Sequence, residues 1–378
     1  MKKGNEEKIL SGAIAILGSG ETSPNLVSVH REMINRLEKI NNPLIFNSPF
    51  GFQENVNELS DKLKKFYKTS LRIDTEILSY KNPSEINTVD YFNSLDKLNK
   101  SNFVFAGPGS PSYAIKVWGG TEFPSSFKNL LKNNGSIVFS SAAATTLGKY
   151  TLPVYEIYKV GEEPYWIKGL DILGSFGINA SIIPHFNNKE GGNHDTRFCY
   201  MGEDRFNTLR SLIESNIIGI DEHTGLVIDG KTCTGKVFGI GVVTLISGEN
   251  KNEYIAGETI SFDHFTALDA NETNKVIPLN KESIKKDINI DEVSSVIIEN
   301  EFNQESINRI LSKIKINLDE LENKTKILDP LVNLIIEVRE SIREQGGFEL
   351  SDYIRDELDR LGIEVKDSNT KTAWKFKA

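Results

Sequence analysis

Short apolar segments alternate with longer amphipathic segments over the first 190 residues, and this alternation constrains the fold more than any other feature. Most of the apolar segments are continuous, which is typical of strands that are covered on both faces. Strands that take turns with helices predict an α/β fold with a doubly wound, mostly parallel sheet. The predicted strands are 12–19, 43–49, 71–78, 102–108, 136–141 and 180–186, and the predicted helices lie near 26–40, 52–68, 86–99, 111–132 and 142–148.

The sequence changes character twice after this region. From residue 217, β-rich segments separated by Asp-Gly and Thr-Gly turn signals predict hairpins that close the sheet. The polar stretch that follows predicts a linker with one helix at 304–323, and apolar residues at helical spacing near the end predict a small helical hairpin joined at Gly346–Gly347. The predicted domains are 1–255, a linker at 256–325, and the hairpin at 326–378.

Composition excludes several classes of protein. The 378 residues carry a net charge of −9, which argues against a general attraction to nucleic acid or to an anionic membrane. Two cysteines without a C-x-x-C spacing do not support a disulfide framework. The first apolar run is short and interrupted by glycine, so it predicts a strand and not a signal peptide, and no run approaches the length of a membrane span. We therefore expect a cytoplasmic protein without a membrane partner.

In a doubly wound sheet, ligands bind at the carboxyl ends of the strands. The stretch "GSIVFSSAAATTLG" ends such a strand with Ser141 and continues into a helix of small residues. A serine at a sharp strand-to-helix turn presents its hydroxyl to the cleft, and the next backbone N–H, that of Ala142, is placed to stabilise an oxyanion. A plain helix N-cap explains the same serine, and on this stretch alone that interpretation is the simpler one.

Two further strand ends carry residues suited to the same chemistry. His185 ends the apolar segment "IIPHF", where it can act as a general base or can be an ordinary histidine at the edge of the core. The loop "FAGPGSPSYA" contains Gly107 and Gly109, which allow a ligand close to the backbone and can supply a second oxyanion donor; a simple Gly-Pro turn is the alternative.

The order "FVFAGPGSPSYAIKV", "SIVFSSAAATTLG", "PHF" and "IIGIDEHTGLVID" resembles the peptidase E / cyanophycinase family over residues 10–250. These are serine peptidases with a class I glutamine-amidotransferase-like fold. The resemblance implies that Ser141 attacks an amide carbonyl, that His185 is its base, and that Gly107, Pro108, Gly109 and Ala142 surround the oxyanion. Phe139 and Ala143 stand where the family's elbow has glycine.

The acid that orients the histidine has two candidates in this comparison. Glu156 in "LPVYEIYKVG" matches a position between the serine and the histidine, and Glu222 in "GIDEHTG" matches a position after the histidine. A carboxylate is needed in either case. The sequence slightly favours Glu156, which is otherwise interpreted as a solvent-facing glutamate.

The loop after the histidine contains further polar residues. Arg197, together with Arg205, is a candidate for holding a substrate carboxylate, although an ordinary solvated loop is the simpler explanation of each. His185, Glu190 and His194 lack a diagnostic metal-ligand spacing, so we expect no metal and no cofactor. Cys199 lies in no elbow and is more simply a packing residue than a nucleophile.

The last fifty residues resemble the C-terminal segment of cysteinyl-tRNA synthetases. The resemblance implies contact with a tRNA anticodon, while a hairpin kept for packing or dimerisation is the alternative. The residues that match the synthetase segment are Arg339, Arg343, Asp352, Ile354, Arg355, Asp356, Leu358, Gly362, Ile363, Asp367, Thr372 and Trp374. The sequence leaves open whether the chain forms a homodimer.

Two functions remain in competition on the sequence alone. The first is a serine hydrolase that cleaves an amide bond of a small peptide or isopeptide through an acyl-enzyme. The second is a catalytically degenerate, amidotransferase-like binding or regulatory protein whose residues 326–378 bind tRNA or a protein partner.

Overall fold

A computed structural model of the chain divides into two compact units, Met1–Lys285 and Lys286–Ala378, which are described separately. None of the helices in the described part of the chain is long and apolar enough to cross a membrane. The structure describes residues 11–86, 88–262, 265, 276–277, 332–333, 335–336, 338–340, 342–343, 346–366 and 373–376.

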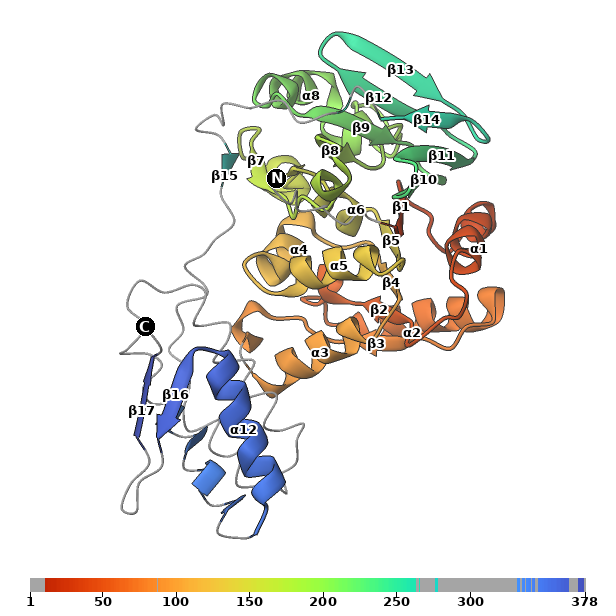
Figure 1. Cartoon of the computed structure of the whole chain (residues 1–378). Helices are drawn as coiled ribbons and strands as arrows, with labels where there is room; N and C mark the ends of the chain where they lie inside the picture. Colours follow the sequence, from red (N-terminus) through yellow and green to blue (C-terminus); the bar gives the residue numbers. More distant parts are fainter. Residues whose placement is uncertain are drawn as a thin grey trace, which may run out of the picture. The chain divides into compact units, whose positions relative to one another are not determined.

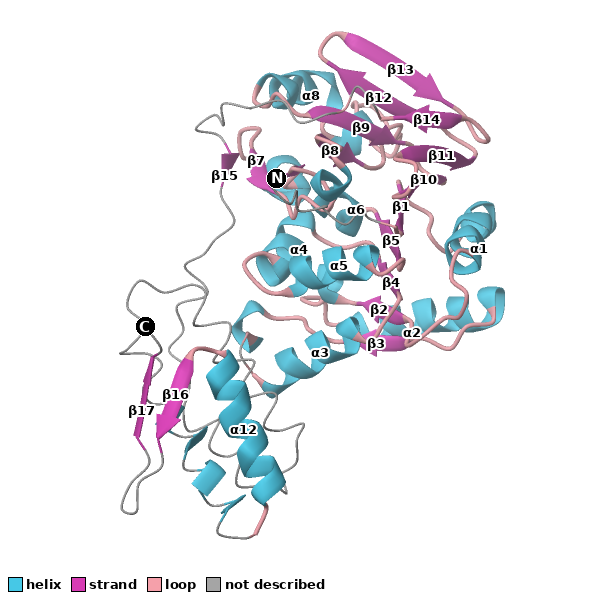
Figure 2. Cartoon of the chain, viewed as in Figure 1, coloured by secondary structure: helices cyan, strands magenta, loops and turns pink. Residues whose placement is uncertain are grey.

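An eight-stranded sheet forms the centre of the first unit, in the order β14-β11-β10-β1-β5-β4-β2-β3 (Figures 1 and 2). The five strands from β1 to β3 are parallel, and β10, β11 and β14 extend the sheet in antiparallel fashion. This confirms the predicted α/β fold with a mostly parallel sheet. The strands are β1 (Ala13–Leu17), β2 (Leu44–Phe46), β3 (Glu76–Leu78), β4 (Phe103–Ala106), β5 (Ser136–Ser140), β10 (Thr224–Asp229), β11 (Thr234–Gly239) and β14 (Thr259–Ser261).

Helices cover both faces of the parallel strands, as the continuous apolar segments predict. Figure 1 shows α1 (Val27–Asn35) and α2 (Val56–Phe66) on one face, with α3 (Val89–Asn99), α4 (Pro111–Trp118) and α5 (Phe123–Lys132) on the other. The single helix expected at 111–132 is therefore two helices. Gly120, with φ 75°, lies between them, in a conformation that ends a helix readily.

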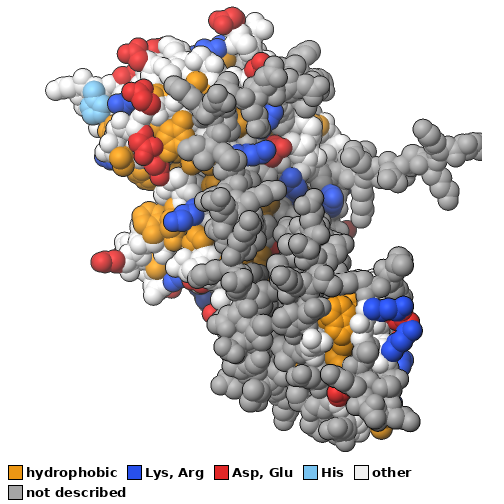
Figure 3. Space-filling view, turned by 90° about the vertical axis from the view of Figure 1, so that its left-hand side faces the viewer, with side chains coloured by type: hydrophobic (Ala, Val, Ile, Leu, Met, Phe, Trp, Pro, Cys, Tyr) orange, Lys and Arg blue, Asp and Glu red, His pale blue; other side chains and the backbone are white. Residues whose placement is uncertain are grey.

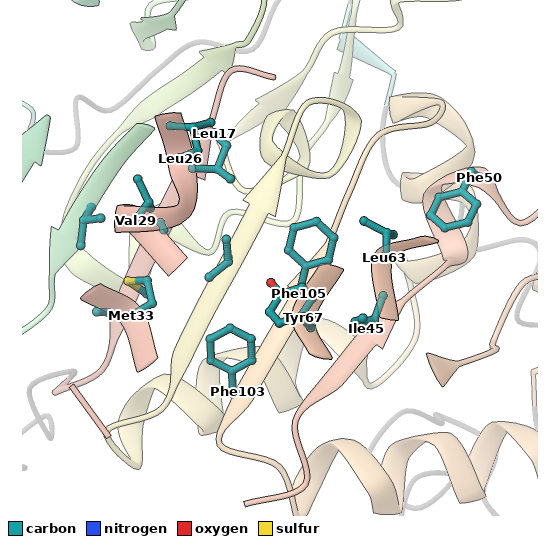
Figure 4. Packing of buried hydrophobic residues seen from close by; sticks show 14 of the residues in the cluster. Leu17, Leu26, Val29, Met33, Ile45, Phe50, Leu63, Tyr67, Phe103 and Phe105 are labelled. Atoms are coloured by element: carbon teal, nitrogen blue, oxygen red, sulfur yellow. The ribbon is translucent and has the colours of Figure 1, made fainter. Parts of the chain in front are cut away.

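The core on the side of α1 and α2 is built from aliphatic and aromatic side chains of both layers (Figure 4). Leu17 of β1 and Phe103 and Phe105 of β4 pack beneath Val29 of α1 and Tyr67, and all five are fully buried. Burial of this apolar area is the main force that fixes helices onto the sheet.

A second sheet of four strands, β13-β12-β9-β8, lies beside the first. Its β8 (Ala180–Ile183) pairs in parallel with β9 (Asn216–Ile220), while β12 (Val243–Ser247) pairs antiparallel with β9 and with β13 (Asn250–Tyr254). The strand expected at 180–186 thus belongs to a different sheet from the five parallel strands. A further small sheet joins β6 (Tyr150–Thr151), β7 (Trp166–Lys168) and β15 (Val276–Ile277).

The C-terminal unit combines helix and strand. Its α12 (Phe348–Arg360) matches the second predicted helix, and helical residues within 332–343 share a buried cluster with it. The strands β16 (Ile363–Lys366) and β17 (Ala373–Phe376) form an antiparallel pair that the sequence analysis did not predict. The predicted helix at 304–323 lies outside the described residues, and β14 pairs with the first sheet from within the segment assigned to the linker.

A fully buried histidine links the core to the loop after β1. Tyr67 Oη lies 3.0 Å from His30 Nδ1, and His30 Nε2 lies 2.8 Å from the Glu21 carbonyl oxygen. A carbonyl only accepts, so Nε2 carries the proton and Nδ1 accepts from the tyrosine hydroxyl. Burial, opposed by the bond to Glu21, lowers the pKa of His30 to about 4.

This pKa predicts acid destabilisation of the first unit. Between pH 6.5 and 4 the unfolded chain binds a proton at His30 that the folded chain does not, so the free energy of unfolding falls by about 3 kcal/mol over that window. We expect the stability difference between wild type and His30→Gln to narrow as the pH falls from 7 to 4, measured by urea unfolding with the fluorescence of buried Trp118 and Trp166. A difference that is constant with pH would contradict the neutral buried histidine.

Candidate active site

Ser141 occupies the sharp turn between β5 and α6 (Ala142–Thr146), with φ 50° and ψ −114°. A non-glycine residue in this region stores strain on the order of 1–3 kcal/mol and persists only where its surroundings impose it. Its N–H donates to the Leu17 carbonyl oxygen at 3.0 Å, and the next turn is fixed by the Ala143 N–H on the Gly107 carbonyl at 3.3 Å. The Ser141 hydroxyl makes no capping hydrogen bond to the helix, so the N-cap interpretation fails.

The two residues that replace elbow glycines are accommodated without disturbing the turn. The ring of Phe139 points away from the elbow and stacks on Trp118 with centroids 5.6 Å apart, and it meets Phe127 edge-on at 5.5 Å. Ala143 is fully buried and is not among the residues with positive φ, so its methyl group adds no backbone strain.

His185 and Glu222 approach the Ser141 hydroxyl from the second sheet. His185 follows β8, and its Nε2 lies 2.9 Å from Ser141 Oγ. Glu222 follows β9, and its Oε1 lies 2.8 Å from His185 Nδ1. A carboxylate only accepts, so Nδ1 carries the proton and Nε2 of the neutral ring is free to accept from the serine hydroxyl.

Two asparagines hold Glu222 in place. Asn188 Nδ2 donates to Glu222 Oε1 at 3.0 Å, and the Glu222 N–H donates to Asn187 Oδ1 at 2.9 Å. The hydrogen bond from His185 lowers the pKa of Glu222, and the bond from Asn188 lowers it further. Together these two bonds outweigh partial burial, which raises the pKa. The carboxylate is therefore ionised at neutral pH, as an acid that orients an imidazole must be. The sequence analysis missed both asparagines, although they directly follow the "HF" pair.

The structure corrects the preference for Glu156 as the acid beside the histidine. Glu156 Oε1 accepts a hydrogen bond from Ser112 Oγ at 2.5 Å, and Ser112 Oγ lies 2.9 Å from Ser110 Oγ. The carboxylate on His185 is that of Glu222. Glu156 begins a short π-helical turn at Glu156–Val160 that places it against α4 rather than against the imidazole.

A pocket of about 210 Å³ opens above these groups. Among the residues proposed to hold an oxyanion, Pro108, Gly109 and Ala142 line the pocket, while Gly107 instead accepts the N–H of Ala143. Gly109 has φ 145°, and a Cβ there would lie 2.1 Å from the Pro49 carbonyl oxygen, so only glycine fits. Proline has no N–H, so of these three residues only Gly109 and Ala142 have an amide N–H to offer at this wall.

Arg197 is not among the residues that line this pocket. Its guanidinium binds both oxygens of Asp195, at 2.9 and 2.8 Å, and Glu203 at 2.7 Å. The hydrogen bonds between the Asp195 and Arg197 side chains raise the pKa of Arg197, and those from Arg197 lower the pKa of Asp195 to about 2. Nε and Nη2 of Arg197 are thus engaged by two carboxylates, outside the residues that line the pocket of Ser141.

The remaining candidates of the loop after His185 serve other purposes. Cys199 lines the pocket, but burial, reinforced by Glu222, raises the pKa of its thiol to about 12, so it is a poor nucleophile at neutral pH. Glu190 accepts from the Tyr200 hydroxyl at 2.6 Å, and His194 Nε2 lies 3.2 Å from the Tyr158 hydroxyl. Within the described ranges, no three His, Cys, Asp or Glu side chains are grouped to hold a metal ion.

Comparisons with known proteins match the chain over two very different lengths. The crystal structure of a peptidase from an acI-B1 Actinobacterium is similar over 66% of this chain and 97% of that chain, with a TM-score of 0.55 and 22% identity. This similarity shows that the first unit has the α/β fold of that peptidase. No family model matches the chain.

A short segment of the chain is similar to cysteine–tRNA ligases. Identity is 39% over 56 residues with the ligase of Petrotoga mobilis and 43% over 54 residues with that of Thermococcus gammatolerans. These segments make up 15% and 14% of this chain but only 12% and 11% of the two ligases, so the chain spans a small part of the curated relatives that it matches.

The contacts of the two glutamates predict different effects when each is replaced by glutamine. In Glu222→Gln, an amide N–H can face His185 Nδ1, which moves the imidazole proton to Nε2 and removes the acceptor of the serine proton. We expect the rate at which a fluorophosphonate labels Ser141 to fall by about 10³-fold or more. The matched variant Glu156→Gln should label at nearly the wild-type rate. Equal losses in both variants, with thermal unfolding unchanged, would contradict this assignment.

Proposed function

We propose that this protein is a serine-type amide hydrolase in which Ser141 is the nucleophile, His185 the general base and Glu222 the orienting acid. The observation that carries the proposal is the continuous series of hydrogen bonds from Ser141 Oγ through the imidazole to the Glu222 carboxylate, at 2.9 and 2.8 Å. A nucleophile within hydrogen-bond reach of a base that is itself oriented by a third group is the signature of covalent catalysis.

The proposed reaction follows from these atoms. His185 Nε2 takes the hydroxyl proton as Ser141 Oγ attacks the amide carbonyl, and the N–H groups of Ala142 and Gly109 stabilise the resulting oxyanion. The ionised Glu222 stabilises the imidazolium, which then protonates the leaving amine. Water, activated by the same histidine, hydrolyses the acyl-serine ester and restores the enzyme.

We propose a small peptide or isopeptide as the substrate, with the residues on either side of the reacting amide bound in the pocket of about 210 Å³. The name peptidase of the Actinobacterium protein agrees with amide-bond hydrolysis. We also propose that the protein is located in the cytoplasm.

A degenerate, non-catalytic elbow is the competing proposal, and labelling separates the two. We expect a fluorophosphonate probe to modify wild-type protein on the peptide that contains Ser141, detected by mass spectrometry, and to leave Ser141→Ala unmodified. Ser140→Ala, which removes the neighbouring hydroxyl, should still be labelled. An unreactive wild type, or equal labelling of wild type and Ser141→Ala, would favour a binding protein.

The similarity to cysteine–tRNA ligases favours a second function for the C-terminal unit. We propose that residues 326–378, the region whose motifs resemble the synthetases, contact tRNA. Lys366 and Lys375 lie on the β16-β17 pair, both near Glu364, and Trp374 is half-buried beside them. In the lower part of Figure 3, Lys and Arg side chains gather beside a hydrophobic patch of this unit.

Aminoacylation is not proposed, because the matched segments cover only about a tenth of the ligases. A homodimer remains a prediction.

Salt dependence tests the tRNA proposal. We expect the full chain to bind a tRNA-Cys transcript in filter-binding assays, with an affinity that falls as salt rises. Lys375→Ala should weaken binding and reduce the slope of log affinity against log salt by about one. Lys68→Ala in the first unit, whose side chain pairs with Asp74, serves as the control. Binding without salt dependence, or equal effects of both variants, would contradict the proposal.

A further inference from the structure

The pocket above Ser141 has an acidic wall. Glu21 and Ser19 line it together with Ser141 and His185, and the described residues that line it include no Lys or Arg. Glu222, which accepts from His185 and Asn188, is not among the residues that line the pocket, whereas Glu21 lines it and accepts from the hydroxyl of Ser140 at 3.0 Å. The net field at this wall therefore favours a positive charge in the pocket.

Glu21 is held by buried contacts and is not a freely moving surface glutamate. Ser140, which fixes one carboxylate oxygen, is the last residue of β5 and is fully buried. The Glu21 carbonyl accepts from His30, which is itself held by Tyr67. On its other side the loop is confined by His223, since a Cβ on Gly20 would lie 2.3 Å from His223 Nδ1. Side chains that are positioned in this way bind with little loss of entropy.

The strand order places the acidic wall opposite the oxyanion donors. In the sheet, β5 lies between β1 and β4, with Leu17 paired to Ser140 and Ala106 to Phe139. The loop after β1 carries Glu21, and the loop after β4 carries Gly109. A substrate whose carbonyl oxygen faces the Gly109 and Ala142 amides therefore extends another part toward Glu21.

We propose that Glu21 binds a cationic nitrogen of the substrate, either the free α-ammonium group or an ammonium on a side chain, and thereby determines which amides reach Ser141. This inference rests on the proposed hydrolase function and deepens it by naming the charge of the substrate. Ser140, His30 and Tyr67 act as positioning residues, since they hold the carboxylate or its loop. A charge-assisted hydrogen bond between an ammonium and a carboxylate is about twice as strong as a neutral one.

Ligand binding tests this inference without relying on turnover. We would measure the affinity of the full chain for alaninamide and for N-acetyl-lysine amide by isothermal titration calorimetry at low salt. Their neutral counterparts are N-acetylalaninamide and N-acetyl-norleucine amide. The first pair tests the α-ammonium source and the second the side-chain source. We expect one cationic ligand to bind about tenfold more tightly than its neutral counterpart, and Glu21→Gln to abolish that preference.

The matched control is Glu190→Gln, which removes a carboxylate from the adjoining pocket formed by Tyr155, Tyr158, Lys159, Glu190 and Tyr200. It should keep the preference, because Glu190 is engaged by Tyr200 and does not line the pocket of Ser141. Equal binding of cationic and neutral ligands, a preference that survives Glu21→Gln, or one that is lost in Glu190→Gln would overturn the inference. Fluorophosphonate labelling of the same samples reports separately on Ser141, so a failure of catalysis is distinguished from a failure of charge recognition.

Discussion

The hydrogen bond between Ser141 Oγ and His185 Nε2 depends on a strained backbone that the rest of the fold imposes. Left to itself, a serine would not adopt φ 50° and ψ −114°. The Leu17 carbonyl on one neighbouring strand and the Gly107 carbonyl on the other hold the chain on both sides of the turn. The parallel sheet thus supplies the stability that keeps one hydroxyl pointing into the pocket.

The site also joins two separate sheets. Ser141 follows β5 of the large sheet, whereas His185 and Glu222 follow β8 and β9 of the smaller one. Asn187 and Asn188 connect the ends of β8 and β9, so Glu222 is held beside the imidazole by contacts that do not involve the serine. The serine–histidine contact therefore depends on how the two sheets pack against each other. Residues far from the pocket therefore contribute to its geometry.

The sequence predicted the strand ends well because buried parallel strands leave a strong pattern of continuous apolar residues. Ser141 and His185 follow directly from that pattern. The choice between Glu156 and Glu222 did not, because the pairing of β8 with β9, which brings Glu222 beside His185, leaves no mark in sequence spacing. Arg197 pairs with Asp195, which lies only two residues away, and such local pairing is indistinguishable in sequence from an open cationic site. The β16-β17 pair was missed because four-residue strands carry too little periodicity.

The most direct test of this account is a crystal structure of the full chain after reaction with a fluorophosphonate. The account predicts continuous density from Ser141 Oγ to phosphorus, the phosphoryl oxygen within hydrogen-bond distance of the Ala142 and Gly109 N–H groups, and His185 still bonded to Glu222. An adduct on any other residue, or a phosphoryl oxygen directed away from those two amides, would contradict it.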